Sequence, residues 1–293
     1  MSKPSEFNAL IARLARMTSS PNGLDSSLMI GQYGGPLSAG LILAALQWLK
    51  THGKVVADQP RLVSLAAGLV RMGGAIGSAR VVTRLFGLLP MIDWLLKLHP
   101  QPVKALIGLI LHPSRFSLDI RNERVYATIR IIALCGYYVG EHTAWLASQG
   151  VLQLQPATVS KIAVWSVRSW ALDVVLSCIQ LFRKYLGLRA RERALKASAK
   201  SEVSTTDDED VEGYELTPEP KEKTTAEDQK AARAALNADW ASWEQQAVVN
   251  YGYLPLTVHW STPGGVWTSP LITAALGSVV SVGKLAGAWA ASA

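Results

Sequence analysis

Charged residues and cysteines are both scarce in this sequence. Asp, Glu, Lys and Arg make up 17% of the 293 residues, while hydrophobic residues make up 49%; soluble domains usually carry roughly 25% charged residues. Cys135 and Cys178 lie in apolar runs, so we expect free, buried thiols and no disulfide framework. The mean hydropathy is +0.18. So much apolar surface exceeds what a soluble core of this size hides, and the composition indicates an integral membrane protein.

The sequence also lacks the short motifs of common enzyme active sites. It contains no GxSxG, no phosphate-binding loop ending in GK[ST], no HExxH and no CxxC. Its five histidines, His52, His99, His112, His142 and His259, are scattered without the spacing of metal ligands. We therefore predict that the chain is not an enzyme and that it holds no cofactor and no metal.

Charge is divided unevenly along the chain. Residues 201–244 hold thirteen acidic and four basic residues, and the rest of the chain carries a net charge of +16. A basic, apolar body suits anionic phospholipid headgroups. Its Arg and Lys residues stand among Leu, Val and Ile, without the polar surface that a phosphate backbone requires, so we predict no nucleic acid partner. The acidic, Ser- and Thr-rich composition of 201–244 predicts a disordered linker.

Helical periodicity predicts an all-α protein. Residues 18–36, rich in Ser, Gly, Asn and Pro, predict a loop, and the apolar helix at 37–49 is too short to span a bilayer. The expected fold is a membrane-associated helical bundle over 1–200 with one to three membrane-embedded helices, followed by the linker and a C-terminal segment at 245–293. The predicted helices are an amphipathic one at about 61–98, apolar ones at about 129–149 and 159–182, and a membrane helix at about 271–290.

The first residues and the segment 80–98 are both amphipathic. Near the N-terminus, apolar residues from Phe7 to Met17 recur at helical spacing with Arg13 and Arg16 on the other side, which predicts a docked amphipathic helix. In the segment 80–98, Leu and Ile fall within one continuous arc at about 100° per residue. Periodicity alone leaves open whether this arc faces lipid or a protein core. Pro90 removes a backbone hydrogen bond and predicts a bend towards the apolar face.

Two stretches together resemble the peroxin-11 family of peroxisomal membrane elongation and proliferation factors, most of all its fungal members. One is LVRMGGAIGSARVVTRLFGLLPMIDWLLKL at 69–98, and the other is YYVGEHTAWLASQGVL at 137–152. The apolar segment LITAALGSVVSVGKLAGAW also resembles the family's last membrane helix. The second stretch is similar to the family's paired Tyr, acid–His and Trp-Leu pattern, here Tyr137, Tyr138, Glu141, His142, Trp145 and Leu146.

The resemblance implies a helical protein of the peroxisomal membrane that remodels and elongates this membrane before fission. It implies that an amphipathic helix inserts into the cytosolic leaflet of the phospholipid membrane, that the chain self-associates, and that it contacts the fission machinery. The membrane-inserting face is then Val81, Leu85, Leu88, Leu89, Ile92, Leu95 and Leu96, and the headgroup-contacting residues are Arg80, Arg84 and Lys97.

A second class of function stays open. Glu141, Arg168, Asp173 and Lys284 lie in apolar segments, where ionisable residues often line a transport pathway. The alternative is therefore a small-metabolite channel or transporter of an organelle membrane. A structural pair of Glu141 with His142 would need no such pathway, and a passive adaptor that recruits partners through the acidic segment is a third possibility.

Overall fold

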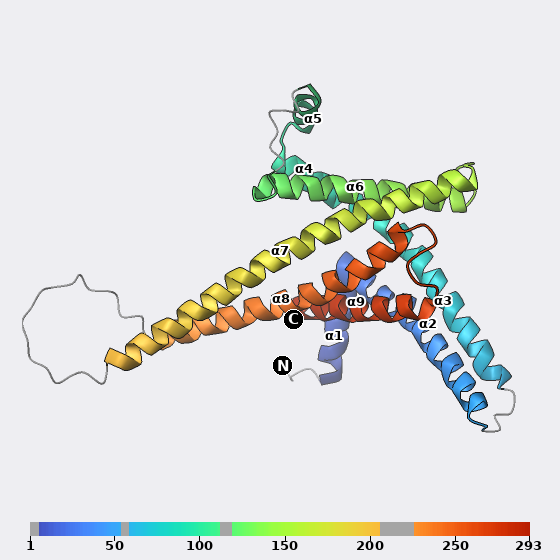
Figure 1. Cartoon of the computed structure of the whole chain (residues 1–293), viewed down its shortest axis with the longest axis horizontal. Helices are drawn as coiled ribbons and strands as arrows, with labels where there is room; N and C mark the ends of the chain where they lie inside the picture. Colours follow the sequence, from blue (N-terminus) through green and yellow to red (C-terminus); the bar gives the residue numbers. More distant parts are fainter. Residues whose placement is uncertain (1–5, 54–58, 112–118, 206–225) are drawn as a thin grey trace, which may run out of the picture. The chain divides into compact units, whose positions relative to one another are not determined.

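A computed structural model describes residues 6–53, 59–111, 119–205 and 226–293, and every regular element within these ranges is helical (Figure 1). The prediction of an all-α protein is therefore confirmed. The chain divides into two compact units, the first formed by Met1–Ser177 with Val248–Ala293 and the second by Cys178–Ala247.

The helices begin at positions that their sequences favour. Five of them start with proline, whose missing N–H is not needed in a first turn. The Asn122 side chain caps the helix that follows it by accepting from the N–H groups of Arg124 and Val125. In chain order the elements are α1 (Glu6–Ser19), α2 (Pro21–Thr51), α3 (Pro60–Arg84), the 3₁₀ helix η1 (Leu85–Gly87), α4 (Leu88–Leu98), α5 (Pro102–Leu111), α6 (Glu123–Ser148), α7 (Pro156–Thr205), α8 (Ala226–Ser261) and α9 (Pro270–Ala291).

The helix α2 differs from the prediction, because it includes most of the segment expected to be a loop. Its glycines allow close contact with α3 instead of ending the helix. A Cβ at Gly35 would lie 3.0 Å from the carbonyl oxygen of Leu69, and one at Gly73 would lie 2.8 Å from that of Gln32. Such small residues let two helix backbones approach closely. Packing therefore outweighs low helix propensity, and the 31-residue α2 is long enough to cross a bilayer.

The acidic segment 201–244 is also more helical than predicted. α7 continues to Thr205 and α8 begins at Ala226, while 206–225 lie outside the described residues. Within the second unit the two helices pair, since Trp243 Nε1 donates to the carbonyl oxygen of Leu181 at 2.8 Å and Tyr185 packs against Trp240. Leu236, Trp240 and Trp243 recur at helical spacing, and the average composition of the segment concealed this apolar stripe.

The core of the first unit lies where α2, α8 and α9 meet. Met29, Leu256 and Val280 are fully buried there, and Tyr33 and Tyr253 are among the partly buried side chains around them. Glycines again permit the close approach, because a Cβ at Gly277 of α9 would lie 2.2 Å from the Tyr33 ring. This core holds α9 against α2.

Four helical segments of the described chain are long and apolar enough to cross a membrane: Pro21–Thr51, Pro60–Leu98, Pro156–Ser198 and Pro270–Ala291. Only between 11% and 33% of the most apolar window in each is buried inside the protein. Apolar surface of this extent without protein neighbours is suited to lipid. The predicted helices at 159–182 and 271–290 fall within two of these segments, whereas α6, which covers most of 129–149, is not among them.

Candidate functional site

The predicted amphipathic helix at 61–98 is divided into α3, η1 and α4. The break falls at Leu85–Gly87 and not at Pro90. Pro90 occupies the first turn of α4, where an N–H has no intrahelical partner, so the ring is accommodated without loss of a hydrogen bond. A 3₁₀ turn that ends directly before α4 therefore interrupts the α-helical hydrogen bonding.

The structure separates the predicted membrane-inserting face into two groups. Val81, Leu88 and Leu95 are half-buried, and α4 packs against α6. The other four residues are exposed and recur at the spacing of one helix face. Together with the neighbouring Phe86, they form what we call the α4 stripe: Leu85, Phe86, Leu89, Ile92 and Leu96.

The three predicted headgroup contacts have different surroundings. Lys97 is exposed and donates to Asp93 at 2.6 Å. Arg80 is only 4% exposed, and both Arg80 and Arg84 form ion pairs with carboxylates of other helices. The helical periodicity placed both arginines on the polar arc, but their partners Asp25 and Glu141 lie 55 and 57 residues away in sequence. Arg80 and Arg84 therefore point into the protein, contrary to the expectation of headgroup contact.

Glu141 of α6 connects that helix to the end of α3. The guanidinium of Arg84 donates two hydrogen bonds to its carboxylate, at 3.0 and 2.6 Å, and the Tyr137 hydroxyl donates a third at 2.7 Å. Burial raises the pKa of Tyr137 well above its usual range, so this phenol remains a neutral donor. Bidentate pairs of this kind fix orientation as well as distance. Glu141 therefore sets the register between α3 and α6.

Tyr138, His142 and Trp145 lie along the same contact, whereas Leu146 bonds the loop that follows α6. The N–H of Leu85 bonds to the carbonyl of Val82 in the 3₁₀ turn, and His142 Nε2 lies 3.1 Å from the Val81 carbonyl oxygen. His142 Nδ1 lies 2.6 Å from the carbonyl oxygen of Tyr138. The Tyr138 hydroxyl lies beside Gly87, where a Cβ would come within 3.0 Å of it. Trp145 Nε1 donates to Ser78 Oγ at 3.2 Å. The Leu146 carbonyl accepts from the N–H of Val151 at 3.0 Å.

The opposite side of the motif packs against α7. Ser166 Oγ donates to the carbonyl oxygen of Tyr137 at 2.7 Å, and a Cβ at Gly140 would lie 2.7 Å from Ser166 Cβ. The Tyr137 ring stacks on Trp170 with centroids 5.6 Å apart. The motif therefore joins α3 to α7 through α6, a packing role that needs no catalytic group.

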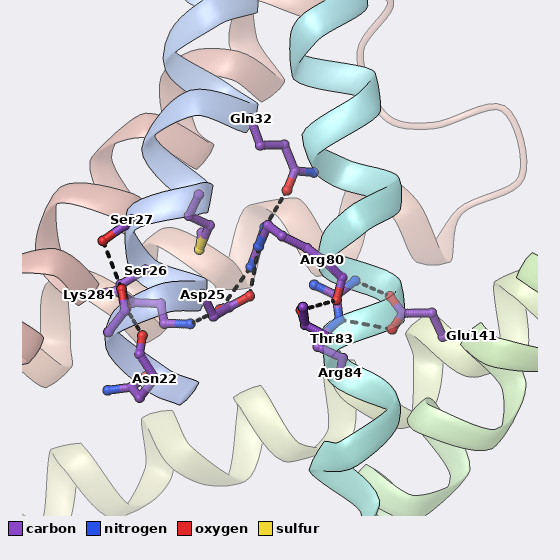
Figure 2. A network of polar contacts seen from close by, with 12 residues as sticks. Asn22, Asp25, Ser26, Ser27, Gln32, Arg80, Thr83, Arg84, Glu141 and Lys284 are labelled. Carbon is purple, nitrogen blue, oxygen red and sulfur yellow. Dashed lines mark hydrogen bonds and ion pairs between the residues drawn. The ribbon is translucent and has the colours of Figure 1, made fainter. Parts of the chain in front are cut away.

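A second ionic network lies one helical turn earlier on α3. Figure 2 shows Asp25 of α2 between Arg80 of α3 and Lys284 of α9, while Arg84 turns towards Glu141. Arg80 Nε and Nη2 bond the Asp25 carboxylate at 2.8 and 3.0 Å, and Lys284 Nζ bonds it at 2.7 Å. Arg80 Nη1 also donates to Gln32. Together, the two networks connect α2, α3, α6 and α9 through buried charge.

Both networks line one pocket of about 1080 Å³ in the first unit. Glu141 and Lys284, two of the residues that suggested a transport pathway, lie in this pocket. The other two lie elsewhere: Asp173 pairs with Arg130 at 2.6 Å, and Arg168 donates to the carbonyl oxygen of Ser261 at 3.3 Å. The four predicted pathway residues therefore do not line a single cavity.

The docking of α1 on α9 was not located by sequence reasoning. Arg13 Nη2 donates to the Trp289 carbonyl oxygen at 2.8 Å, and Arg16 Nε donates to that of Ser292 at 3.3 Å. Cations favour the last carbonyls of a helix, so these arginines dock the polar side of α1. Its apolar side, from Phe7 to Leu14, stays exposed. The basic arc of α1 was the available signal, but it does not identify the helix that it meets.

Metal ligands and thiols are the remaining groups that could carry chemistry. Within the described ranges, no cluster of His, Cys, Asp and Glu side chains is arranged to hold a metal ion. Cys135 and Cys178 are free, as predicted, but they are partly exposed rather than buried. Neither thiol contributes to the two ionic networks.

Comparison with known proteins finds a family similarity over part of the chain. Residues 118–245 match the sequence profile described as Peroxisomal biogenesis factor 11 (PEX11), a region that contains the six motif residues of α6. The amphipathic stretch at 69–98 lies before the matched region. No curated protein and no solved structure matches the chain. Over residues 118–245 the chain is therefore similar to the peroxisomal biogenesis factor 11 family, a family of peroxisomal membrane proteins.

Proposed function

We propose that this protein is a peroxisomal proliferation factor that elongates the membrane by inserting the α4 stripe into one leaflet. The similarity of residues 118–245 to the peroxisomal biogenesis factor 11 family supports the broader role in peroxisome biogenesis. The observation that carries the finer proposal is the exposure of the stripe: Phe86 is 68% and Leu89 64% exposed, although the other side of α4 packs against α6. An apolar face of this kind without a protein neighbour favours lipid.

The length of α4 supports an interfacial position. Its 11 residues span about 16 Å, roughly half of the hydrocarbon core of a bilayer. An amphipathic helix lies in the plane of the interface with its apolar face about 5–10 Å deep. Such insertion adds area to one leaflet only, and this asymmetry favours positive curvature. The contact with α6 holds α4 with its stripe outward.

The apolar side of α1 supports the same proposal. Phe7, Leu10 and Ile11 are exposed on a helix whose arginines are bound to the end of α9. The helix therefore presents a second apolar face without a protein neighbour. Two expectations remain predictions: self-association and contact with the fission machinery. Self-association would concentrate several inserted α4 stripes, which act as wedges, on one patch of membrane.

The wedge proposal is tested with full-length protein reconstituted into anionic liposomes. Leu89→Glu replaces an apolar side chain whose burial is worth about 1.5–3 kcal/mol by a charged one, so we expect a several-fold loss of membrane tubules. Val151→Glu is the matched control, because Val151 is 66% exposed but lies outside α4. Electron microscopy at equal protein incorporation measures the effect. Equal tubulation by wild type and Leu89→Glu would contradict the proposal.

A second candidate function, transport of a small solute, is favoured by the pocket of about 1080 Å³. Its ionisable lining lies among apolar helices, as in membrane pathways. Flux through reconstituted protein tests it, with loss expected in Glu141→Gln. Asp173→Asn is the control, because Asp173 pairs with Arg130 and does not line this pocket. An equal loss in both variants would indicate a folding defect and count against transport.

A further inference from the structure

Asp25 forms ion pairs with two cationic side chains, Arg80 and Lys284. Its carboxylate accepts hydrogen bonds from Arg80 at 2.8 and 3.0 Å and from Lys284 at 2.7 Å (Figure 2). Arg84 and Glu141, by contrast, pair one to one. These five side chains are the formally charged groups that the described residues contribute to the lining of the pocket. The pocket therefore carries a formal charge of +1.

This excess charge lies in a poorly solvated place. The side chains of Arg80, Asp25 and Lys284 are 5%, 18% and 21% exposed, and they come from helices long and apolar enough to cross a membrane. A charge removed from water is unfavourable unless a counter-charge accompanies it. One bound anion would neutralise the formal charge of +1 in the pocket.

The donors in the pocket favour a phosphate group over a carboxylate. The guanidinium of Arg80, whose planar fork suits carboxylates, already bonds Asp25 through Nε and Nη2. The Lys284 ammonium has three N–H groups and donates one to Asp25 at 2.7 Å, and such a compact charge is a common phosphate ligand. The Tyr33 phenol lines the same pocket as a further polar group, whereas the Tyr253 hydroxyl already donates to Met29 Sδ at 3.4 Å.

We propose that this pocket binds one phosphate group, with Lys284 as its principal ligand and Asp25 as the carboxylate that offsets only one of the two positive charges of Arg80 and Lys284. The volume of about 1080 Å³ exceeds the need of an inorganic phosphate and admits a phosphorylated small molecule or a lipid headgroup. The site is separate from the α4 stripe, so it does not depend on the wedge proposal.

Binding to the full-length, detergent-purified protein tests the proposal, with inorganic phosphate as the soluble probe. Lys284→Met lowers the pocket charge to zero and is expected to weaken binding at least about tenfold, the loss of one charge-assisted hydrogen bond. Asp25→Asn raises the charge to +2 and is expected to strengthen binding. A purely structural role would weaken binding in both variants, and that outcome overturns the proposal.

Further variants keep the test informative if Asp25→Asn does not fold. Lys284→Arg keeps the charge and is expected to retain binding, whereas Lys284→Met loses it. Lys161→Met is the control, because Lys161 lines a different pocket of about 910 Å³. Equal affinity of wild type and Lys284→Met, or an equal loss in Lys161→Met, overturns the proposal.

A second arm identifies the source of the phosphate. The same variants are incorporated into phosphatidylcholine nanodiscs with and without phosphatidic acid, and lipid retention is measured by mass spectrometry. Lys284-dependent binding of inorganic phosphate supports a soluble ligand, and Lys284-dependent retention of phosphatidic acid alone supports a headgroup. Absence of Lys284 dependence with both probes overturns the site.

Discussion

Glu141 shows how much a single side chain contributes to the arrangement of the helices. Its carboxylate accepts hydrogen bonds from Arg84 and Tyr137, and its side chain is 17% exposed. Asp93 forms an ion pair of similar length with Lys97, at 2.6 Å, but both of those side chains are more than half exposed. Exposed pairs contribute little because water screens them, whereas removal of one partner from a buried pair leaves a charge without compensation.

Glu141→Ala is therefore expected to destabilise the folded chain by about 3–5 kcal/mol, because it leaves the half-buried Arg84 guanidinium without its carboxylate partner. Asp93→Ala is expected to cost about 1 kcal/mol or less. Thermal unfolding in detergent measures both. A double variant, Arg84→Met with Glu141→Leu, removes both charges and is expected to recover most of the loss. Equal melting temperatures for Glu141→Ala and Asp93→Ala would contradict the assigned role.

The sequence predicted the side chains of α4 better than those of α3. Lys97 and Leu89 are exposed and lie on the arcs that periodicity assigned to them. Arg80 and Arg84 were also placed on the polar arc, but a helical projection does not reveal that Asp25 and Glu141 approach them from other helices. Asp25, a lone carboxylate among small and apolar residues, was the available signal for such a partner.

At the scale of elements, two adjacent glycines on α3 have opposite environments. A Cβ at Gly73 would lie 2.8 Å from the Gln32 carbonyl oxygen and from the Pro36 ring of α2. At Gly74 nothing lies within 4 Å of that position. Substitution of Gly73 therefore tests the packing requirement for glycine, and substitution of Gly74 tests its low helix propensity alone.

Gly73→Ala is expected to destabilise the α2–α3 contact by about 1–3 kcal/mol, because the added methyl group meets backbone and ring atoms. Gly74→Ala is expected to be neutral or to stabilise by about 0.5–1 kcal/mol, since alanine favours the helix. Both changes are read from the thermal unfolding midpoint in detergent. Similar shifts in the two variants would show that the close approach of α2 and α3 does not depend on Gly73.

The same contacts explain where the prediction of elements failed. Glycine and serine in 18–36 were interpreted as loop formers, yet in α2 they provide a surface that α3 and α9 approach closely. The acidic content of 201–244 outweighed the spacing of Leu236, Trp240 and Trp243 in the prediction of a linker. Local composition predicts propensity, whereas helix pairing depends on residues distant in sequence. Long apolar helices such as α9 were predictable because composition and periodicity agree there.

At the scale of the whole molecule, the contact between α1 and α9 has a topological consequence. Arg13 and Arg16 bond the carbonyl groups of Trp289 and Ser292, so the first helix and the end of the last one lie together in the first unit. We therefore predict that α1 and the end of α9 lie on one side of a membrane.

Tags fused to the two termini are therefore expected to show the same protease sensitivity in intact peroxisomes. A third tag, inserted between α2 and α3, is the internal comparison: it is expected to show the opposite sensitivity if α2 crosses the bilayer. Immunoblots before and after membrane permeabilisation measure all three. One protected terminus beside one accessible terminus would contradict the α1–α9 contact in the membrane.

The hydrogen-bonded contact between α1 and the end of α9 also constrains the number of times that the chain crosses the membrane. A polypeptide whose two ends lie on the same side of a bilayer crosses that bilayer an even number of times. The four candidate segments satisfy this parity if all of them cross, whereas three would not. Any variant that converts one crossing into a surface helix must therefore convert a second one or pull Arg13 away from Trp289.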